Sequence, residues 1–189
     1  APLPGIAVRI TDTDDDTRRL PLTERGMIWL KGANIFTGYI GRPELNAEII
    51  RDGWYKTGDI GRLDLNGFIT LGGRLARFSK IGGEMVSLNA VDEMVHNAYA
   101  NSGAEYSYGV VSVPHESKGE QIVLVTNNKD VTQDGLHSFI RSNGMSELYL
   151  PRIILYHDSL PVFATGKADN VTLKKQVLEE LGLNMPQAA

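Results

Sequence analysis

The pattern of apolar residues changes at the glycine pair Gly72-Gly73. Ahead of this pair, short apolar runs at residues 6–10 and 26–31 predict β-strands, and the polar residues 11–19 between them predict a hairpin loop. After it, strand-like runs alternate with runs whose apolar residues recur at helical spacing. A strand-rich part followed by a mixture of strands and helices predicts an α+β fold.

Two adjacent glycines allow the backbone to change direction at little steric cost. We therefore expect a domain boundary at Gly72-Gly73, with residues 1–72 forming a β-rich part and residues 73–189 forming a second domain. In that second domain, Gly82-Gly83 is expected to turn one strand into another, and Ser87 is placed to cap a helix. We also expect a helix at residues 44–50 and strands at residues 68–71, 77–81, 108–113, 121–125 and 152–156. Three further helices are expected, with their buried apolar residues within 88–98, 136–140 and 173–181, and Gly182 is expected to end the last of them.

The composition excludes several classes of function. The 189 residues include 19 basic and 23 acidic side chains, a formal net charge of −4, and the basic residues form no stripe of the kind that binds nucleic acid. There is no cysteine, which excludes disulfides, cysteine-ligated zinc and a thiol nucleophile. The histidines lie far apart, and the aspartates within residues 12–16 lack the downstream residues of a calcium loop, so we expect no metal site. No apolar run reaches the roughly 18 residues that span a bilayer.

Two short motifs carry the candidate chemistry. Residues 55–59 read Tyr-Lys-Thr-Gly-Asp, and residues 165–167 read Thr-Gly-Lys after a proline-bearing loop. The Asp59 carboxylate can accept hydrogen bonds from two neighbouring hydroxyls, such as the ribose 2′- and 3′-hydroxyls, although Thr-Gly-Asp taken alone is more often a plain turn. Arg74 could bond the ribose or a phosphate, or it could pair with a carboxylate at the domain junction.

Lys167 is the sharpest candidate. It lies in a glycine turn ahead of the last expected helix, and a lysine keeps its charge near neutral pH because its reference pKa is about 10.4. Aimed at a pentacoordinate phosphorus, its ammonium group would stabilise charge that develops only in the transition state. Taken alone, a Gly-Lys pair is more often an ordinary surface lysine. The chain has no P-loop, so phosphate binding would need residues of a partner domain.

The order of these motifs resembles the C-terminal part of the AMP-forming superfamily of acyl-CoA synthetases, peptide-synthetase adenylation domains and luciferases. Within it, residues 73–88, 147–152 and 165–174 resemble one branch, the bifunctional acyl-[acyl-carrier-protein] synthetases/2-acylglycerophosphoethanolamine acyltransferases. The resemblance covers essentially the whole chain, and only the synthetase half of those bifunctional proteins. It implies that residues 1–72 end the large ligase domain and that residues 73–189 form a mobile C-terminal domain.

The resemblance also implies roles for single residues. Lys167 would help to join the carboxylate to the α-phosphate of ATP, while Asp59 and Arg74 would hold the ribose, with Tyr55 beside them in the nucleotide site. In a second pose of the mobile domain, Gly82-Gly83 would guide a phosphopantetheine thiol to the acyl-adenylate. A plain hairpin turn at these two glycines is equally compatible with the sequence.

Two positions depart from the superfamily pattern. Ala76 stands at the expected hinge, where Asp or Lys is usual in the superfamily. The neighbouring residues Leu75 and Arg77 could therefore contribute to the hinge rotation as well. Met85 stands where an arginine often follows the glycine-rich turn, so we do not expect the phosphate contact of that arginine in this chain.

The implied function is the C-terminal part of an ATP-dependent acyl-acyl-carrier-protein ligase that serves lysophospholipid re-acylation. Its implied partners are the upstream ligase domain, which would hold most of the ATP and Mg²⁺ sites, acyl carrier protein with its phosphopantetheine, a fatty acid and a lysophospholipid. The parent protein is expected at the cytoplasmic face of the inner membrane. Because the chain begins with neither an initiator methionine nor a signal peptide, we expect it to be a piece of a longer polypeptide that is inactive in isolation.

Two alternatives stay open. One is an acyl-CoA ligase, which would share every residue named above, and the other is a non-catalytic module that docks a carrier protein. The intact ribose-site and lysine residues favour an enzyme, since a docking module has no use for all of them. The basic residues Arg77, Lys80 and Lys118 could attract an acidic carrier protein, although solvated surface charges are the commoner explanation.

Overall fold

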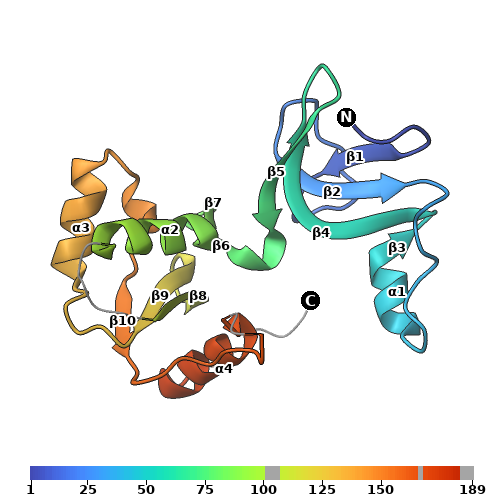
Figure 1. Cartoon of the computed structure of the whole chain (residues 1–189). Coiled ribbons are helices and arrows are strands. Elements are labelled where there is room, and N and C mark those ends of the chain that lie inside the picture. Colours follow the sequence, from blue (N-terminus) through green and yellow to red (C-terminus); the bar gives the residue numbers. More distant parts are fainter. Residues whose placement is uncertain (101–106, 166–167, 184–189) are drawn as a thin grey trace. The chain divides into compact units, whose positions relative to one another are not determined.

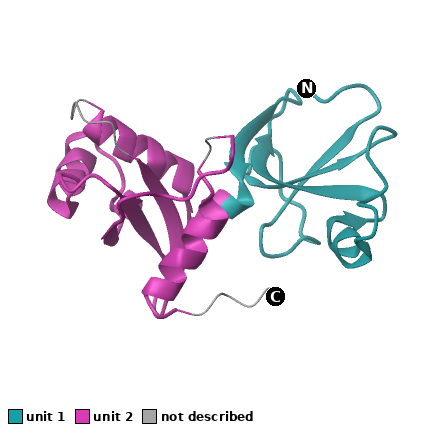
Figure 2. Cartoon of the chain, turned by 60° about the horizontal axis from the view of Figure 1, so that its bottom comes forward, with its two compact units in different colours: residues 1–76 teal, residues 77–189 magenta. Residues whose placement is uncertain are grey.

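The computed structural model describes residues 1–100, 107–165 and 168–183. The chain divides into two compact units, residues 1–76 and residues 77–189 (Figure 2). Across the described residues, no helix is both long enough and apolar enough to cross a membrane.

The first unit is an antiparallel sheet of five strands accompanied by one short helix (Figure 1). In chain order these are β1 (Ala7–Thr11), β2 (Gly26–Lys31), α1 (Pro43–Ile49), β3 (Ile50–Arg51), β4 (Trp54–Leu63) and β5 (Ile69–Arg74). Strand β4 is central, because β2 pairs with one of its edges while β3 and β5 pair with the beginning and the end of the other. The pair Gly72-Gly73 lies within β5, and the domain boundary that we expect there stays a prediction.

The core of the first unit is centred on the fully buried Trp29 of β2. Its indole Nε1 donates a hydrogen bond of 2.9 Å to Thr11 Oγ1, so two buried polar groups satisfy each other. The guanidinium group of Arg9 lies 4.8 Å from the centroid of the Trp29 ring and 4.5 Å from that of Trp54. These contacts fix β1 against β2 and the beginning of β4.

In its described residues, the second unit is a mixed sheet of five strands with three α-helices (Figure 1). Strands β8 (Tyr108–His115) and β9 (Gly119–Thr126) pair antiparallel along their whole lengths, and β10 (Ile153–Tyr156) runs parallel to β9. The remaining elements are η1 (Leu75–Arg77), which begins in the first unit, β6 (Phe78–Ile81), β7 (Glu84–Ser87), α2 (Leu88–Tyr99), α3 (Gln133–Ser142), η2 (Glu147–Tyr149) and α4 (Asn170–Glu180).

Helices cover both faces of this sheet (Figure 1). Alternate residues of a strand point to opposite faces, and β8 and β9 are apolar at consecutive positions because both of their faces are buried. Helices α2 and α3 pack on the face that carries Val110, Ile122 and Leu124. Helix α4 packs on the opposite face against Val111, Val113, Val123 and Val125.

The α+β fold predicted from the sequence is confirmed. Ser87 caps α2 as predicted, its side-chain oxygen accepting a 3.3 Å hydrogen bond from Ala90 N. Gly182 follows the end of α4 with a left-handed φ of 65°. Some predicted boundaries are wrong. Arg77 ends the short helix η1 and does not begin the next strand. Ile50 belongs to β3 and not to the preceding helix, and Phe68 and Arg152 lie just before β5 and β10.

Candidate functional site

Three residues of the first motif, Thr57, Gly58 and Asp59, form a bulge within β4, where a turn was the simplest expectation. A single residue of β2, Ile28, faces all three. The Thr57 hydroxyl donates a 2.8 Å hydrogen bond to Ile28 O and accepts a 3.0 Å bond from Asp59 N. Hydrogen bonds of the Thr57 side chain thus replace main-chain hydrogen bonds between β2 and β4 where the bulge interrupts them. Gly58 has a φ of 76°, a conformation that favours glycine.

The bulge places Asp59 beside Arg74 of β5. The two residues are register partners on neighbouring antiparallel strands, and Arg74 Nε lies 2.9 Å from Asp59 Oδ1. A second guanidinium nitrogen of Arg74, Nη1, donates a 2.9 Å hydrogen bond to Thr57 O. Two contacts therefore orient the Arg74 side chain over the bulge, although 66% of its surface and 32% of the Asp59 side-chain surface remain exposed.

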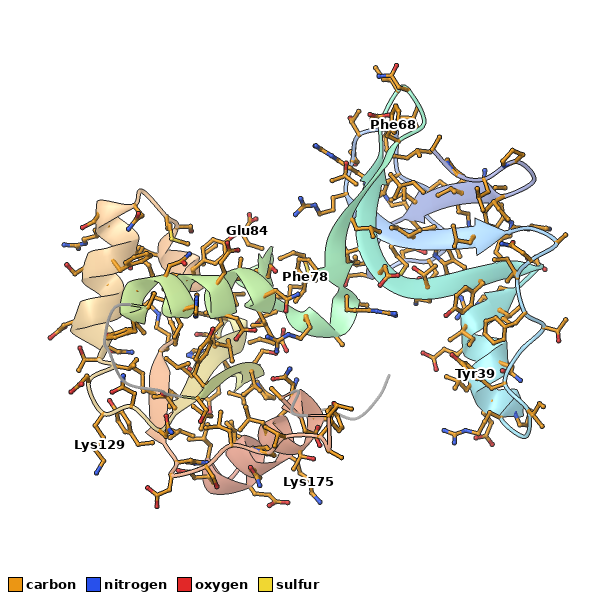
Figure 3. The ribbon with its side chains drawn as sticks, in the orientation of Figure 1. Tyr39, Phe68, Phe78, Glu84, Lys129 and Lys175 are labelled. Carbon is orange, nitrogen blue, oxygen red and sulfur yellow. The ribbon has the colours of Figure 1, made fainter. Side chains whose placement is uncertain are left out.

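Tyr55 belongs to an aromatic cluster on the same unit. The Phe36 ring packs edge-on against Tyr55 at 5.0 Å between centroids and against Tyr39 at 5.1 Å. Tyr39, which lies beside α1 (Figure 3), is held by two hydrogen bonds between its main chain and the side chain of Asn46, of 2.7 and 2.8 Å. Burial and the neighbouring Tyr39 hydroxyl raise the pKa of the Tyr55 phenol, while Arg74 opposes that rise.

Tyr39, Tyr55 and Arg74 border one pocket of about 450 Å³ in the first unit. Its walls come from α1, the first half of β4, the end of β5 and the beginning of η1. The structure thus brings together the predicted residues Tyr55, Arg74 and Ala76, and Asp59 joins them through its ion pair with Arg74. The other lining residues are Met27, Tyr39, Leu45, Glu48, Ile49, Lys56, Thr57, Gly58 and Leu75.

Sequence reasoning missed Tyr39 and Phe36. No motif marks either residue, and their contribution depends on the loop that leads into α1 lying against β4. The only available signal was the presence of aromatic residues in a loop, which is too common to be informative.

The other predicted residues lie in the second unit. Gly82 and Gly83 have φ values of 60° and 91° and form the two-residue turn between β6 and β7, in which Ile81 pairs with Glu84. Lys167 lies outside the described residues. Within the described ranges, no three His, Asp or Glu side chains gather as a metal site.

Arg77 does not fit the carrier-protein docking role that its charge suggested. Its guanidinium group bonds Asn89 Oδ1 at 2.9 Å and Val110 O at 2.7 Å, and it forms an ion pair with Asp92. Only 15% of the Arg77 side chain is exposed, so its charge is committed to α2 and β8. Burial raises the pKa of the Asp92 carboxyl, and Arg77 partly opposes that rise.

Comparison with known proteins points to one group of enzymes. No protein-family profile matches the chain. It is 30% identical over 168 residues to a long-chain-fatty-acid–CoA ligase of Yersinia pestis, and the match covers 88% of this chain and 29% of that protein. It is 31% identical over 160 residues to the oxalate–CoA ligase of Arabidopsis thaliana, covering 82% of this chain and 30% of that protein. The chain therefore spans less than a third of the length of these relatives.

Solved structures agree with these relatives. ATP-bound MatB from Rhodopseudomonas palustris is 27% identical with a TM-score of 0.70, and the match covers 95% of this chain and 35% of that one. The o-succinylbenzoate CoA synthetase MenE of Bacillus subtilis, in complex with its acyl-adenylate intermediate, is 26% identical with a TM-score of 0.71, covering 92% and 34%. The chain belongs to the AMP-forming acyl-CoA ligase superfamily and corresponds to the C-terminal region of its members.

Proposed function

We propose that this chain is the C-terminal part of an ATP-dependent acid–thiol ligase. In the first half-reaction, a carboxylate attacks the α-phosphorus of ATP, giving an acyl-adenylate and releasing pyrophosphate. In the second, a thiol attacks the acyl carbon, giving a thioester and releasing AMP. The observation that carries the proposal is the Asp59–Arg74 pair beside the pocket that Tyr55 also lines.

The chemistry of this pocket suits a nucleoside. A carboxylate accepts hydrogen bonds from adjacent hydroxyls, and the exposed face of Asp59 leaves room for a ribose diol. Arg74 fixes the carboxylate on one side and adds donors of its own. Tyr55 adds an aromatic side chain to the pocket wall. Magnesium accompanies ATP in this chemistry, but the described residues contain no group of three or more His, Asp or Glu side chains that could hold it, and we assign it to no residue.

Lys167 is proposed as the lysine of the first half-reaction on the strength of its sequence motif. Val162 and Ala168 form an antiparallel bridge on either side of the motif, and Asp169 caps α4 just after it. A lysine ammonium group that reaches the α-phosphate would neutralise charge gained in the transition state.

The thiol acceptor has two candidates. Relatives named as CoA ligases support coenzyme A. The resemblance of residues 73–88 and 165–174 to the bifunctional branch supports the phosphopantetheine of acyl carrier protein, with a fatty acid and a lysophospholipid as the other partners and a parent protein at the inner membrane. Both acceptors end in the same phosphopantetheine arm, so Gly82-Gly83 would serve either one.

Pyrophosphate exchange with a long-chain fatty acid tests the proposal in the full-length ligase that carries this chain. Lys167→Ala should lower exchange by hundreds-fold, the usual effect of losing one preorganised donor, while acyl transfer from supplied acyl-adenylate survives. Lys175→Ala, at an exposed lysine of α4 (Figure 3), is the matched control and should leave both reactions unchanged. Undiminished exchange in Lys167→Ala would favour the non-catalytic docking module.

An acyl-transfer assay with the same full-length ligase distinguishes the two candidate thiol acceptors. Labelled acyl-adenylate is offered with coenzyme A in one reaction and with phosphopantetheinylated acyl carrier protein in the other. Transfer to the carrier protein alone would support the acyl-acyl-carrier-protein synthetase, and transfer to coenzyme A alone would support the acyl-CoA ligase.

A further inference from the structure

The hairpin formed by β6 and β7 is joined to the rest of its sheet by few main-chain contacts. Among the described residues, the register of β6 with β9 consists of the single pair Ile81 and Gly119. One further main-chain hydrogen bond, of 2.8 Å, runs from Gly82 N to Lys118 O. Strands β6 and β7 are each four residues long, and a hairpin of that size is marginally stable without support.

Ile81 and Val86 pack the hairpin into the core of the second unit, and a carboxylate adds a further contact to its main chain. Glu120 Oε2 accepts a 2.7 Å hydrogen bond from Lys80 N, the main-chain donor two residues ahead of the Gly82-Gly83 turn. Its other oxygen, Oε1, accepts a 3.1 Å bond from the hydroxyl of Ser112, which is 4% exposed on β8. The Glu120 carboxylate thus accepts a main-chain hydrogen bond from β6, as the carbonyl of a neighbouring strand would in a longer sheet. The negative charge of the carboxylate strengthens its hydrogen bonds from Lys80 N and from the Ser112 hydroxyl.

This hydrogen bond lies in the wall of a groove between the two hairpin tips. The groove has a volume of about 440 Å³ and lies wholly within the second unit. Among the described residues, the positions where Gly82 and Gly83 would carry a Cβ atom face open space. The groove is lined by Lys80, Gly82, Gly83, Ser117, Lys118, Gly119 and Glu120.

We propose that Glu120 is a positioning residue for the acyl-transfer half-reaction. Its carboxylate holds the main chain of β6, and thereby the Gly82-Gly83 turn, in the conformation that guides the phosphopantetheine arm. This inference rests on the proposed function, since it needs a thiol acceptor at that turn. A misplacement of about 1 Å in a guiding element costs up to about 100-fold in rate. Glu120 has no part in forming the acyl-adenylate.

The test compares Glu120→Ala with Glu120→Gln in the full-length ligase. Glu120→Ala should lower kcat for transfer from supplied acyl-adenylate about 10- to 100-fold, while pyrophosphate exchange stays within about twofold. Glu120→Gln keeps a carbonyl oxygen for Lys80 N and should recover most of the transfer rate. Glu116→Ala, in the loop that joins β8 to β9, is the matched control and should transfer normally.

Hydrogen exchange in the same variants supplies a structural readout. The Lys80 amide should exchange faster in Glu120→Ala than in the native chain and should regain protection in Glu120→Gln. Normal transfer in Glu120→Ala, or an equal loss of both half-reactions, would overturn the positioning role and leave the proposed function standing. A native enzyme that neither exchanges pyrophosphate nor acylates a thiol would overturn the proposed function, and the role of Glu120 with it.

Discussion

Asp59 and Arg74 are register partners on β4 and β5, and Arg74 Nε lies 2.9 Å from Asp59 Oδ1. Both side chains are partly exposed, and exposed ion pairs contribute only about 0–1 kcal/mol to stability. The pair therefore matters for orientation. It holds the Asp59 carboxylate against Arg74, which lines the same pocket as Tyr55.

Removing the Asp59 carboxylate should impair adenylate formation in the full-length ligase. A hydrogen bond to a charged group contributes about 1.5–3 kcal/mol, so losing even one of the two ribose bonds in Asp59→Ala should lower kcat/KM for ATP by at least about 10- to 100-fold. Asp59→Asn keeps one acceptor oxygen and should lose less. Steady-state pyrophosphate exchange measures both variants, with Glu24→Ala, at an exposed acid of the same unit, as the control. Equal activity in Asp59→Ala and Glu24→Ala would remove Asp59 from the nucleotide site.

The pKa of Tyr55 reports the geometry of the pocket. Burial and Tyr39 raise this pKa, and Arg74 lowers it. Tyr39→Phe should therefore lower the pKa of Tyr55, whereas Arg74→Met should raise it further. Carbon-13 NMR titration of the labelled tyrosine Cζ resonances in this chain measures both changes. Shifts of the same sign in the two variants would contradict the arrangement described here.

The Arg77–Asp92 pair should give the second unit a pH-dependent stability. The folded-state pKa of Asp92 is raised by burial, so the folded chain keeps a proton that the unfolded chain releases near its ordinary pKa of about 3.9. The free energy of unfolding contributed by this group therefore falls as pH rises from about 3.9 through the raised pKa. Asp92→Asn should flatten that part of the profile.

Urea unfolding at a series of pH values checks this slope, with Asp134→Asn on the exposed face of α3 as the control. Arg77→Met offers a second test, because the Arg77 charge holds the pKa of Asp92 down. Carboxyl carbon NMR should show a higher Asp92 midpoint in that variant. An unchanged midpoint would mean that the two groups do not interact in solution.

This chain alone should bind ATP weakly. Lys167 is assigned to charge that develops only in the transition state, so the ground-state contacts that we assign to this chain are those of the ribose. A single pair of charge-assisted hydrogen bonds corresponds to millimolar affinity, about −4 kcal/mol. Isothermal titration of the chain with ATP measures this directly. A micromolar dissociation constant would show that the chain also holds the adenine or the phosphates.

The local features of this protein could be predicted from its sequence. The cap at Ser87, the turn at Gly82-Gly83 and the left-handed Gly182 depend on residues within a few positions of one another. The order of strands and helices gave the α+β class, because apolar periodicity reports which face of each element is buried. The motif ending at Asp59 marks a nucleotide-site candidate by its residue order alone.

Contacts between residues that are far apart in the sequence could be identified only from the tertiary structure. Asp59 meets Arg74 only because of the register of β4 and β5, and the bulge at Thr57–Asp59 was invisible in a motif that reads as a turn. The sequence predicted a solvated or docking charge at Arg77, whose guanidinium group is instead bonded to α2 and β8. Strand register and the burial of a long charged side chain are set by packing across the whole unit. No local sequence pattern encodes them, and for that reason the contacts of Arg77 and Glu120 emerged only from the fold.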